Sequence, residues 1–207
     1  MIRFRNRTEA GRLLAEALKS YKGQAGVVYP LPRGGVPLGV EIARALEMEL
    51  DLLIPRKVGH PYNPEYAIAA VGETGEPVIN PVEVSRVDPE WFKQAVQQQR
   101  DEASRRRKAY LGDRQPISVE GKVAIVVDDG IATGLTMRAA INDARARHPA
   151  KLVVAIPVVP ADTAARLRET VDDLVALEIA EHYLGAVGSY YDEFPQLEDA
   201  DVISLFR

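Results

Sequence analysis

A buried strand followed by a helix recurs along this chain, and this repeat constrains the fold more than any other feature of the sequence. The apolar runs Val27 to Leu31, Val123 to Val127 and Lys151 to Val159 are each followed by a helical pattern. Unbroken apolar strands are typical of parallel sheets, and parallel strands need crossover helices. The sequence therefore predicts an α/β fold with a mostly parallel central sheet flanked by helices.

The other expected elements follow from capping residues and hydrophobic periodicity. Asn6 and Glu9 are spaced as a capping box at the start of a helix that reaches Tyr21, and Asp88 before Pro89 starts a helix that reaches about Tyr110. We expect further helices over 37–46, from the turn near 134 to 147, and over 162–169 with Asp162 as cap. Strands are expected over 50–55 and 174–179. A loop is expected over 59–64, followed by a hairpin that pairs 66–72 with 77–79. From about Ala180 the periodicity fades, and we expect loops that close over one edge of the sheet.

Composition narrows the functional classes. The 207 residues fit one domain over 1–207, and the absence of cysteine excludes disulfide scaffolds, zinc ribbons, iron–sulfur clusters and thiol nucleophiles. Lys and Arg number 26 against 30 Asp and Glu, a net charge of -4 that gives no general attraction for nucleic acid or anionic membranes. The basic run Arg105 to Lys108 lies at a helix end, where cations suit the helix dipole; a nucleic-acid patch is the alternative interpretation.

Targeting and membrane signals are weak. The first ten residues lack the apolar stretch of a signal peptide, and the longest apolar run, Val153 to Pro160, is too short to span a bilayer. We therefore expect a soluble, cytoplasmic protein with no membrane partner.

The segment from Val126 to Thr136 carries the chemistry. It joins a buried strand to a helix through a turn in which Asp128 and Asp129 precede glycines and hydroxyls. Backbone amides at such a helix start form an anion site, which Thr133 and Thr136 can extend. Two acids beside a phosphate fit if they accept hydrogen bonds from sugar hydroxyls, or hold Mg²⁺ directly or through water. A structural acid pair and a receiver-like acidic pocket are the alternatives.

Known phosphate motifs of other kinds are missing. The turn has no Lys, so GxxxxGK[ST] is absent, and no GxGxxG follows a strand. ATP or NAD binding by those routes is disfavoured.

The two acids and the hydroxyl-rich turn resemble the phosphoribosyl-pyrophosphate motif of type I phosphoribosyltransferases at nearly every position. Leu31 to Val36 resembles the pyrophosphate loop of that family, and the spacing between the motifs is also similar. Further similarity to a bacterial subgroup of the family covers the rest of the chain, through the segments 56–59, 63–65 and 186–191. The acid and Thr-Gly motif is specific, and the other segments are weaker signals.

The resemblance implies a set of site residues. Phosphate and sugar would contact the turn, the pyrophosphate would contact the Arg33 loop, and a mobile lid over 59–65 would exclude water. The implied catalytic residues are Asp128, Asp129, Glu65 and Lys57; the first two are also the Mg²⁺ ligands. The implied substrate-binding residues are Arg33, Gly34, Gly35, Arg56, Gly130, Ile131, Ala132, Thr133, Gly134, Leu135, Thr136, Tyr190 and Tyr191.

Some of these assignments have alternatives. Lys57, with Arg56 as its alternate, is equally well a surface cation, and His60 and Tyr62 are either lid contacts or solvated. A hood built from the N-terminal region and residues from about 180 to 207 would recognise the acceptor, and the aromatics Tyr183, Tyr190, Tyr191 and Phe194 either stack on it or pack the hood. The resemblance also suggests a cis or strained Arg33-Gly34 peptide.

The expected function is Mg²⁺-dependent transfer of 5-phosphoribosyl from 5-phosphoribosyl 1-pyrophosphate to a nitrogen nucleophile, with a nucleobase as the first candidate and with inversion. Enzymes acting on 6-oxopurines carry a Lys where this chain has Val158-Val159-Pro160, which argues against those acceptors. The alternatives are a nucleotide-sensing regulator with the same fold, and transfer to ammonia or an amine. Homodimers are common in the family, and nucleic acid is not an expected partner.

Overall fold

The computed structural model describes residues 2–206 and is built on a five-stranded sheet in the order β2-β1-β6-β7-β8. Every neighbouring pair of strands in it is parallel. Its strands are β1 (Gly26–Pro30), β2 (Glu49–Leu50), β6 (Val123–Val127), β7 (Lys151–Pro160) and β8 (Asp173–Ala180). The predicted parallel sheet is confirmed.

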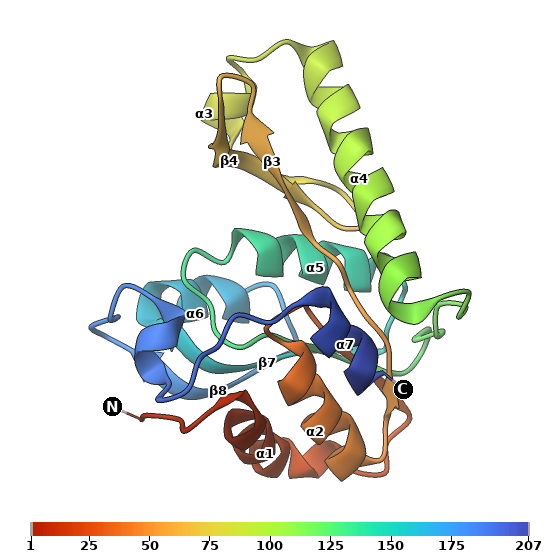
Figure 1. Cartoon of the computed structure of the whole chain (residues 1–207), viewed down its shortest axis with the longest axis vertical. Helices are drawn as coiled ribbons and strands as arrows, with labels where there is room; N and C mark the ends of the chain where they lie inside the picture. Colours follow the sequence, from red (N-terminus) through yellow and green to blue (C-terminus); the bar gives the residue numbers. More distant parts are fainter. Residues whose placement is uncertain (1, 207) are drawn as a thin grey trace.

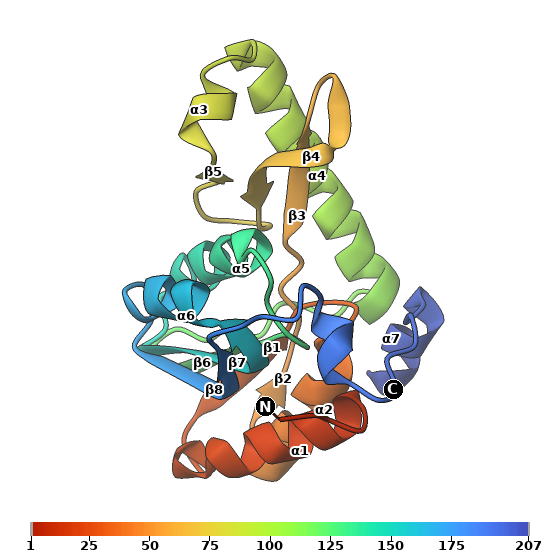
Figure 2. The same cartoon turned by 90° about the vertical axis from the view of Figure 1, so that its left-hand side faces the viewer.

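Helices cover both faces of this sheet (Figures 1 and 2). On one face lie α1 (Arg7–Ala17), the short 3-10 turn η1 (Lys19–Tyr21) and α2 (Val36–Leu46); on the other lie α5 (Leu135–Arg145) and α6 (Ala161–Arg168). Successive strand residues point to opposite faces, so Val28 packs with the α1 and α2 side whereas Val27 packs with the α5 and α6 side. Burial of both faces explains why the strands read as unbroken apolar runs.

Residues 56–111 form an arm that projects from the body of the molecule (Figures 1 and 2). It consists of β3 (Arg56–His60), β4 (Asn63–Val71), β5 (Val78–Ile79), α3 (Pro81–Val84) and the long helix α4 (Pro89–Leu111). Near its start, α4 packs Phe92 and Val96 against Val58 of β3, and near its end Tyr110 packs against Leu52 of the body. One helix therefore belongs to two small cores and sets the position of the arm.

Three local predictions need correction. The loop expected over 59–64 is the tip of the β3–β4 hairpin, because its Gly and Pro residues mark a tight turn and a bulge at Gly59 rather than a long connection. The strand expected over 50–55 ends at Leu50, where Asp51 turns its carboxylate onto the backbone amide of Leu52. Asp162 does not cap α6; it lies in the first turn and pairs with Arg166 at 3.0 Å. The predicted hairpin of β4 with β5 is confirmed.

The tail beyond Ala180 is more ordered than expected. It contains the 3-10 turn η2 (Val187–Tyr190) and the helix α7 (Asp199–Leu205), which begins with a capping box of Glu198 and Asp201. Val202 and Phe206 pack α7 against α2 and α4. The expectation of loops alone is wrong, because a helix of 7 residues is too short for its apolar period to be recognised in the sequence.

The N-terminal residues lie beside part of this tail. The Phe4 amide donates to the Tyr190 carbonyl at 2.8 Å, and the Asp192 amide donates to the Phe4 carbonyl at 2.9 Å. We call residues 2–7 together with 183–197 the hood.

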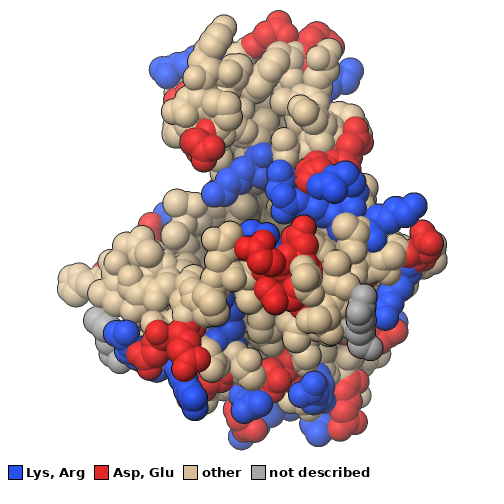
Figure 3. Space-filling model, in the orientation of Figure 1, with Lys and Arg blue, Asp and Glu red and all other residues tan. Residues whose placement is uncertain are grey.

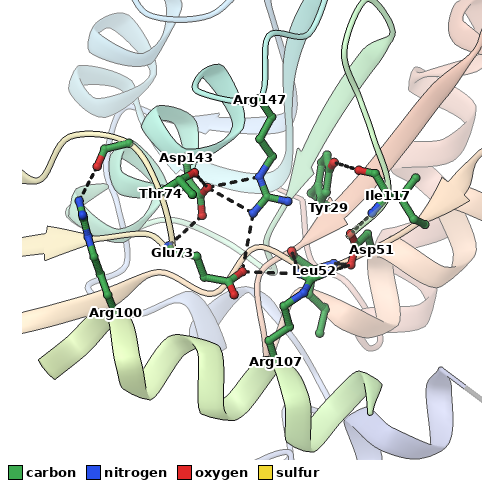
Figure 4. A network of polar contacts seen from close by, with 11 residues as sticks. Tyr29, Asp51, Leu52, Glu73, Thr74, Arg100, Arg107, Ile117, Asp143 and Arg147 are labelled. Atoms are coloured by element: carbon green, nitrogen blue, oxygen red, sulfur yellow. Dashed lines mark hydrogen bonds and ion pairs between the residues drawn. The ribbon is translucent and has the colours of Figure 1, made fainter. Parts of the chain in front are cut away.

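A network of charged side chains joins the arm to the body (Figure 4). Asp51 binds Arg107 of α4, and Asp143 of α5 binds Arg147 at 3.2 Å and the Thr74 hydroxyl of the arm. Glu73 lies between the two arginines, 3.5 Å from Arg107 and 3.7 Å from Arg147. The arm is thus fixed to the body by ion pairs as well as by α4.

No helix within residues 2–206 is both long enough and apolar enough to cross a membrane.

Candidate active site

The acid pair lies at the carboxyl end of β6. Asp128 and Asp129 directly follow the strand, and the Asp129 amide donates to the Asp128 carboxylate at 2.9 Å. The Tyr191 hydroxyl donates to the Asp129 carbonyl at 2.6 Å, which fixes the backbone from the hood side. Parallel sheets bind ligands at this edge. The Asp128 carboxylate is held there by a backbone amide, and the Asp129 carboxylate by the Arg7 side chain at 2.9 Å.

Burial changes the protonation of both acids. It raises the pKa of Asp128 well above its ordinary value, and the charge of Asp129 raises that pKa further. Burial also raises the pKa of Asp129, although the neighbouring guanidinium of Arg7 opposes this shift. The pair is therefore a desolvated, mutually repelling arrangement that gains from any cation or hydrogen-bond donor placed beside it.

Backbone amides at the start of α5 lie next in the chain. The first N–H groups of a helix have no partner within it, so the amides of Leu135 and Thr136 are available to a ligand. Gly134 precedes them with φ +77°, a left-handed conformation that favours glycine. Ile131 differs from expectation: its side chain is in the core and its amide donates to the Val158 carbonyl at 3.0 Å, so it cannot serve a phosphate.

The remaining positions of the predicted turn lie as expected for a ligand loop. Ala132 and Thr133 are exposed, Thr136 is half-buried, and Gly130 is buried with φ +157° against Val187 of the hood. A Cβ at Gly130 would collide with Val187, so glycine lets the hood approach the turn.

The turn after β1 faces the acid pair. A Cβ on Gly34 would collide with the carboxylate of Asp129, and one on Gly35 would come within 2.6 Å of the Val127 carbonyl. The Gly35 amide donates to the Leu31 carbonyl at 3.0 Å, so Gly35 supplies close approach rather than a free donor. The cis peptide is Pro32-Arg33, one bond earlier than the expected Arg33-Gly34, and the expectation is wrong by that bond.

Arg33 lies between the site and the tail. Its guanidinium is 3.6 Å from both Glu198 and Asp199 at the start of α7. Asp199 also accepts a hydrogen bond from Tyr110 of α4 at 2.8 Å. The predicted phosphate-binding arginine is thus near the site but is paired with tail carboxylates.

A cavity of about 480 Å³ opens beside Asp129. The turn after β1 contributes Arg33 and Gly34, and the hood closes the other side; the lining residues are Arg7, Arg33, Gly34, Asp129, Val187, Phe194, Pro195, Gln196 and Leu197. Arg7 is the site residue that the sequence reasoning missed. The sequence offers one signal that could have identified it. Arg7 is the first residue of α1, where a positive charge is unfavourable next to the helix dipole, so its presence there needs another explanation.

Two predicted acceptor contacts are corrected. Tyr190 and Tyr191 are only 1% and 3% exposed and belong to the core under α1 and α2, so their rings are unavailable for stacking on a ligand. Tyr190 stacks on Tyr183 at 5.6 Å, and Tyr191 packs on Phe194 at 4.8 Å. Of the four hood aromatics, Phe194 lines the cavity.

The arm carries the remaining predicted residues. Lys57 is exposed on β3, whereas Arg56 is half-buried, donates to Gln99 at 3.2 Å, and has its pKa lowered by burial. Glu65 is exposed near the hairpin tip, where Tyr62 is 92% exposed and its ring is tilted against that of His60. These side chains lie on the arm, and no contact within residues 2–206 joins them to the acid pair.

Charge is unevenly distributed around the base of the arm. Figure 3 shows Lys and Arg side chains gathered where the arm meets the body, next to a group of Asp and Glu side chains. No cluster of three acidic or histidine side chains able to hold a metal occurs in the described part of the chain. A cation bound at the acid pair would therefore need ligand or water oxygens besides Asp128 and Asp129.

The sequence matches the family described as "Phosphoribosyl transferase domain" over residues 6–193, which includes the acid pair, both turns and most of the hood. The chain belongs to this family. The family predicted from the two motifs is thereby confirmed.

Curated relatives in Mycobacterium tuberculosis extend the comparison. One, from strain H37Rv and named "Putative phosphoribosyl transferase", is 40% identical over 204 residues, which are 98% of this chain and 46% of that protein. The chain spans about half the length of the curated relatives it matches.

Solved structures agree on the fold. A crystal structure of a protein from Thermus thermophilus superposes with a TM-score of 0.84 at 41% identity and covers 99% of this chain and 98% of its own. A Neisseria gonorrhoeae protein crystallised with bound ppGpp has a TM-score of 0.51 at 11% identity, covering 100% of this chain and 97% of that one. The second likeness concerns the fold alone.

Proposed function

We propose that this chain transfers a 5-phosphoribosyl group from 5-phosphoribosyl 1-pyrophosphate to a nitrogen nucleophile, with the help of Mg²⁺. The observation that carries the proposal is the position of the acid pair at the end of β6. In the sequence the pair precedes the turn that leads to the open amides of α5, and in space the Asp129 carboxylate lies against Gly34. A sugar with a phosphate at one end and a leaving group at the other needs these three features side by side.

The 5-phosphate would bind at the start of α5. Unlike the Ile131 amide, the amides of residues 132–136 are not hydrogen-bonded to the sheet, and the hydroxyls of Thr133 and Thr136 add donors. The positive end of the helix dipole favours the same anion. Gly134 lets the backbone turn without a side chain in the way.

The ribose hydroxyls would lie on the acid pair. Asp128 and Asp129 are acceptors in a partly dry site, where a hydrogen bond from a hydroxyl offsets the cost of their burial. The same donor set fits Mg²⁺, since each carboxylate keeps one oxygen outside its hydrogen bonds to the described residues, and the ion commonly binds one or two carboxylates plus phosphate oxygens. Asp128 and Asp129 would hold the ion, which would neutralise charge on the leaving pyrophosphate.

The leaving group would lie toward the turn after β1. Breaking the bond from C1′ to the pyrophosphate oxygen sends the electron pair to pyrophosphate, and the nitrogen lone pair forms the new bond to C1′ while its proton passes to water. Arg33 and the Gly34 amide are donors on this side of the cavity, with Lys57 and Arg56 on the arm as further cations. When the donor binds, Arg33 would leave Glu198 and Asp199 and bind phosphate oxygens instead.

We propose that the hairpin tip of the arm, residues 59–65, is the lid. It carries Glu65, His60 and Tyr62, which are exposed or half-buried and contact nothing on the body within residues 2–206. Movement of this tip over the sugar would exclude water, which otherwise competes for an activated ribose. The hood would form the acceptor side of a single domain.

The experiment that tests the proposal follows pyrophosphate release. The protein is incubated with the donor, Mg²⁺ and a panel of nucleobases, ammonia and small amines, and donor binding is measured separately by calorimetry. Release that depends on one acceptor supports the transferase. Donor binding with no release under any acceptor would favour the sensing alternative, and no binding of any ribose 5-phosphate compound would reject both. The homodimer and the cytoplasmic location stay predictions.

A further inference from the structure

Arg7 is held in one orientation by three contacts from two parts of the chain. Its Nε donates to Asp129 Oδ2 at 2.9 Å, its Nη1 donates to the Pro195 carbonyl at 2.7 Å, and the guanidinium lies 3.8 Å from the centre of the Phe194 ring. The residue is 9% exposed. A guanidinium fixed in this way has already lost its rotamer freedom, so a ligand that binds it meets no further ordering cost.

These contacts leave much of the donor capacity unused. A guanidinium has five N–H groups, and within residues 2–206 only two of those of Arg7 are engaged. Arg7 lines the 480 Å³ cavity and also a smaller one of about 210 Å³ on the hood side. No nitrogen of Arg7 is among the buried unpartnered side-chain atoms of residues 2–206, so its unengaged N–H groups are open to the two cavities, where an accepting oxygen can reach them.

The charge of the larger cavity points to the same kind of ligand. Its charged lining is Arg7 and Arg33 against Asp129; Arg33 is also 3.6 Å from Glu198 and Asp199, which are not part of the lining. Asp129 is the group that the proposed function assigns to the ribose, which leaves the two arginines facing the rest of the ligand. Phe194, Val187 and Leu197 supply an apolar wall beside them.

A purely structural explanation accounts for less of this geometry. Arg7 and Arg107 are equally buried, each with 10% of the side chain exposed, but Asp129 is 14% exposed beside the cavity whereas Asp51, the partner of Arg107 in the joint between arm and body, is 2% exposed. Arg7 also stands at the first position of α1, where its charge opposes the helix dipole. A bound anion would offset that cost.

Resting on the proposed function, we infer that Arg7 binds an anionic oxygen of a ligand seated in the cavity between the hood and Asp129. The oxygen belongs either to the pyrophosphate end of the donor or to a carboxylate on the acceptor, since both would lie beside the ribose. Arg7 would then select ligands by charge, and it would compensate the repulsion between the acid pair and an anionic ligand.

The test compares Arg7→Gln and Arg7→Lys with a matched control, Arg12→Gln. Arg12 lies on the same helix and makes an ion pair of the same length, 2.9 Å from Nε to Glu41, but is exposed outside the cavity. Calorimetry with Mg²⁺ measures the binding of inorganic pyrophosphate, ribose 5-phosphate, uracil and uracil-6-carboxylate to each protein. The last two differ by one carboxylate.

We expect Arg7→Gln to weaken binding of pyrophosphate or of uracil-6-carboxylate by about 10- to 100-fold, the value of one charge-assisted hydrogen bond. Loss for pyrophosphate places the oxygen on the donor, and loss for the carboxylated ring places it on the acceptor. Arg7→Lys should keep part of the affinity, and it serves alone if Arg7→Gln does not fold. Arg12→Gln should bind as the unmodified protein does.

Two results would overturn the inference. One is that pyrophosphate and uracil-6-carboxylate bind the Arg7 variants as tightly as they bind the unmodified protein. Unchanged pyrophosphate binding overturns it equally if uracil-6-carboxylate binds neither the variants nor the unmodified protein. The other is an equal loss for ribose 5-phosphate and for the anionic probes, which would mean that Arg7 only shapes the site. If the unmodified protein binds neither pyrophosphate nor ribose 5-phosphate, the proposed function itself has failed.

Discussion

Two clusters of buried charge differ in how completely the chain satisfies them. In the joint between arm and body, Asp51 accepts hydrogen bonds from the Leu52 and Ile117 amides in addition to its ion pair with Arg107. In the site, Asp128 and Asp129 repel one another and share the nearby cation Arg7. In the first cluster the protein completes Asp51, although Arg107 Nε and Glu73 Oε2 beside it have no hydrogen-bond partner within residues 2–206; in the second, the acid pair adjoins a cavity where a ligand can bind.

The difference separates a structural role from a binding role. Around the joint, the aromatic ring of Tyr29 and the guanidinium of Arg147 enclose the charges, and burial raises the pKa of Tyr29 to about 12. Asp129 lines a cavity of about 480 Å³, whereas the cavity of about 250 Å³ beside the joint is lined by Glu73 and Arg107 but not by Asp51. Breaking the joint should therefore cost stability, whereas breaking the site should cost function.

The largest expected effect is on the joint. Asp51→Ala removes the nearest carboxylate of the buried Arg107, which keeps the Leu52 carbonyl and Glu73 at 3.5 Å, and it removes the acceptor of two backbone amides; we expect a loss of about 3–5 kcal/mol in the free energy of unfolding, measured with urea. The matched control is Glu49→Ala, which removes an exposed pair with Lys122 and should cost at most about 1 kcal/mol. Equal losses in the two variants would contradict the contrast.

Next in size is the effect of Asp129→Asn on turnover. Removing one such electrostatic contact commonly lowers kcat by roughly 10² to 10³, and we expect that loss in pyrophosphate release while circular dichroism shows an intact fold. Turnover like that of the unmodified protein would remove Asp129 from the proposed mechanism.

A smaller effect concerns pH. Because the pKa of Asp128 is raised on folding, the folded protein holds this proton more tightly than the unfolded chain does. The contribution of Asp128 to stability therefore falls as the pH rises from about 3.8, its ordinary pKa, toward the raised value. Asp128→Asn lacks this penalty.

The measurement compares unfolding in urea for the unmodified protein and Asp128→Asn across this range. We expect the ligand-free variant to become the more stable of the two as the pH rises. A constant difference between them at every pH would show that the Asp128 carboxyl is not desolvated.

The smallest expected change in stability is at the arm tip. Tyr62 is exposed, so Tyr62→Ala should alter the free energy of unfolding by less than about 0.5 kcal/mol. If the hairpin tip of the arm is a lid, Tyr62→Ala should also lower turnover or raise hydrolysis of the donor by water. Unchanged kinetics would exclude Tyr62 as a lid contact.

Local patterns predicted the sheet and most helices because they depend on neighbours in the chain. The β6 strand is apolar on both faces, and Asp88 and Asn6 cap their helices with their own side chains. The acid pair and the α5 turn were predictable for the same reason, since strand, acids and amides are consecutive.

Contacts between distant segments were not predictable. Arg7 lies 122 residues from Asp129, and nothing in either local sequence indicates that they meet. The burial of Tyr190 and Tyr191 depends on Phe4 and α1 covering them, which no periodicity encodes. The enclosure of Asp51 likewise needs Arg107 from the far end of α4.

The hydrogen bond from Tyr191 to the main chain of Asp129 has a consequence for how acceptor choice can change over evolution or by engineering. Under the proposed function, the hood segment that would choose the acceptor is bonded directly to the backbone of a residue that would hold the ribose, so remodelling the one would displace the other. Grafting a foreign recognition segment onto this chain would succeed only if Phe4, Arg7 and Tyr191 were transplanted as a set. We then expect new specificities to arise through cavity-lining residues that are not hydrogen-bonded to the Asp129 main chain, such as Val187 and Gln196.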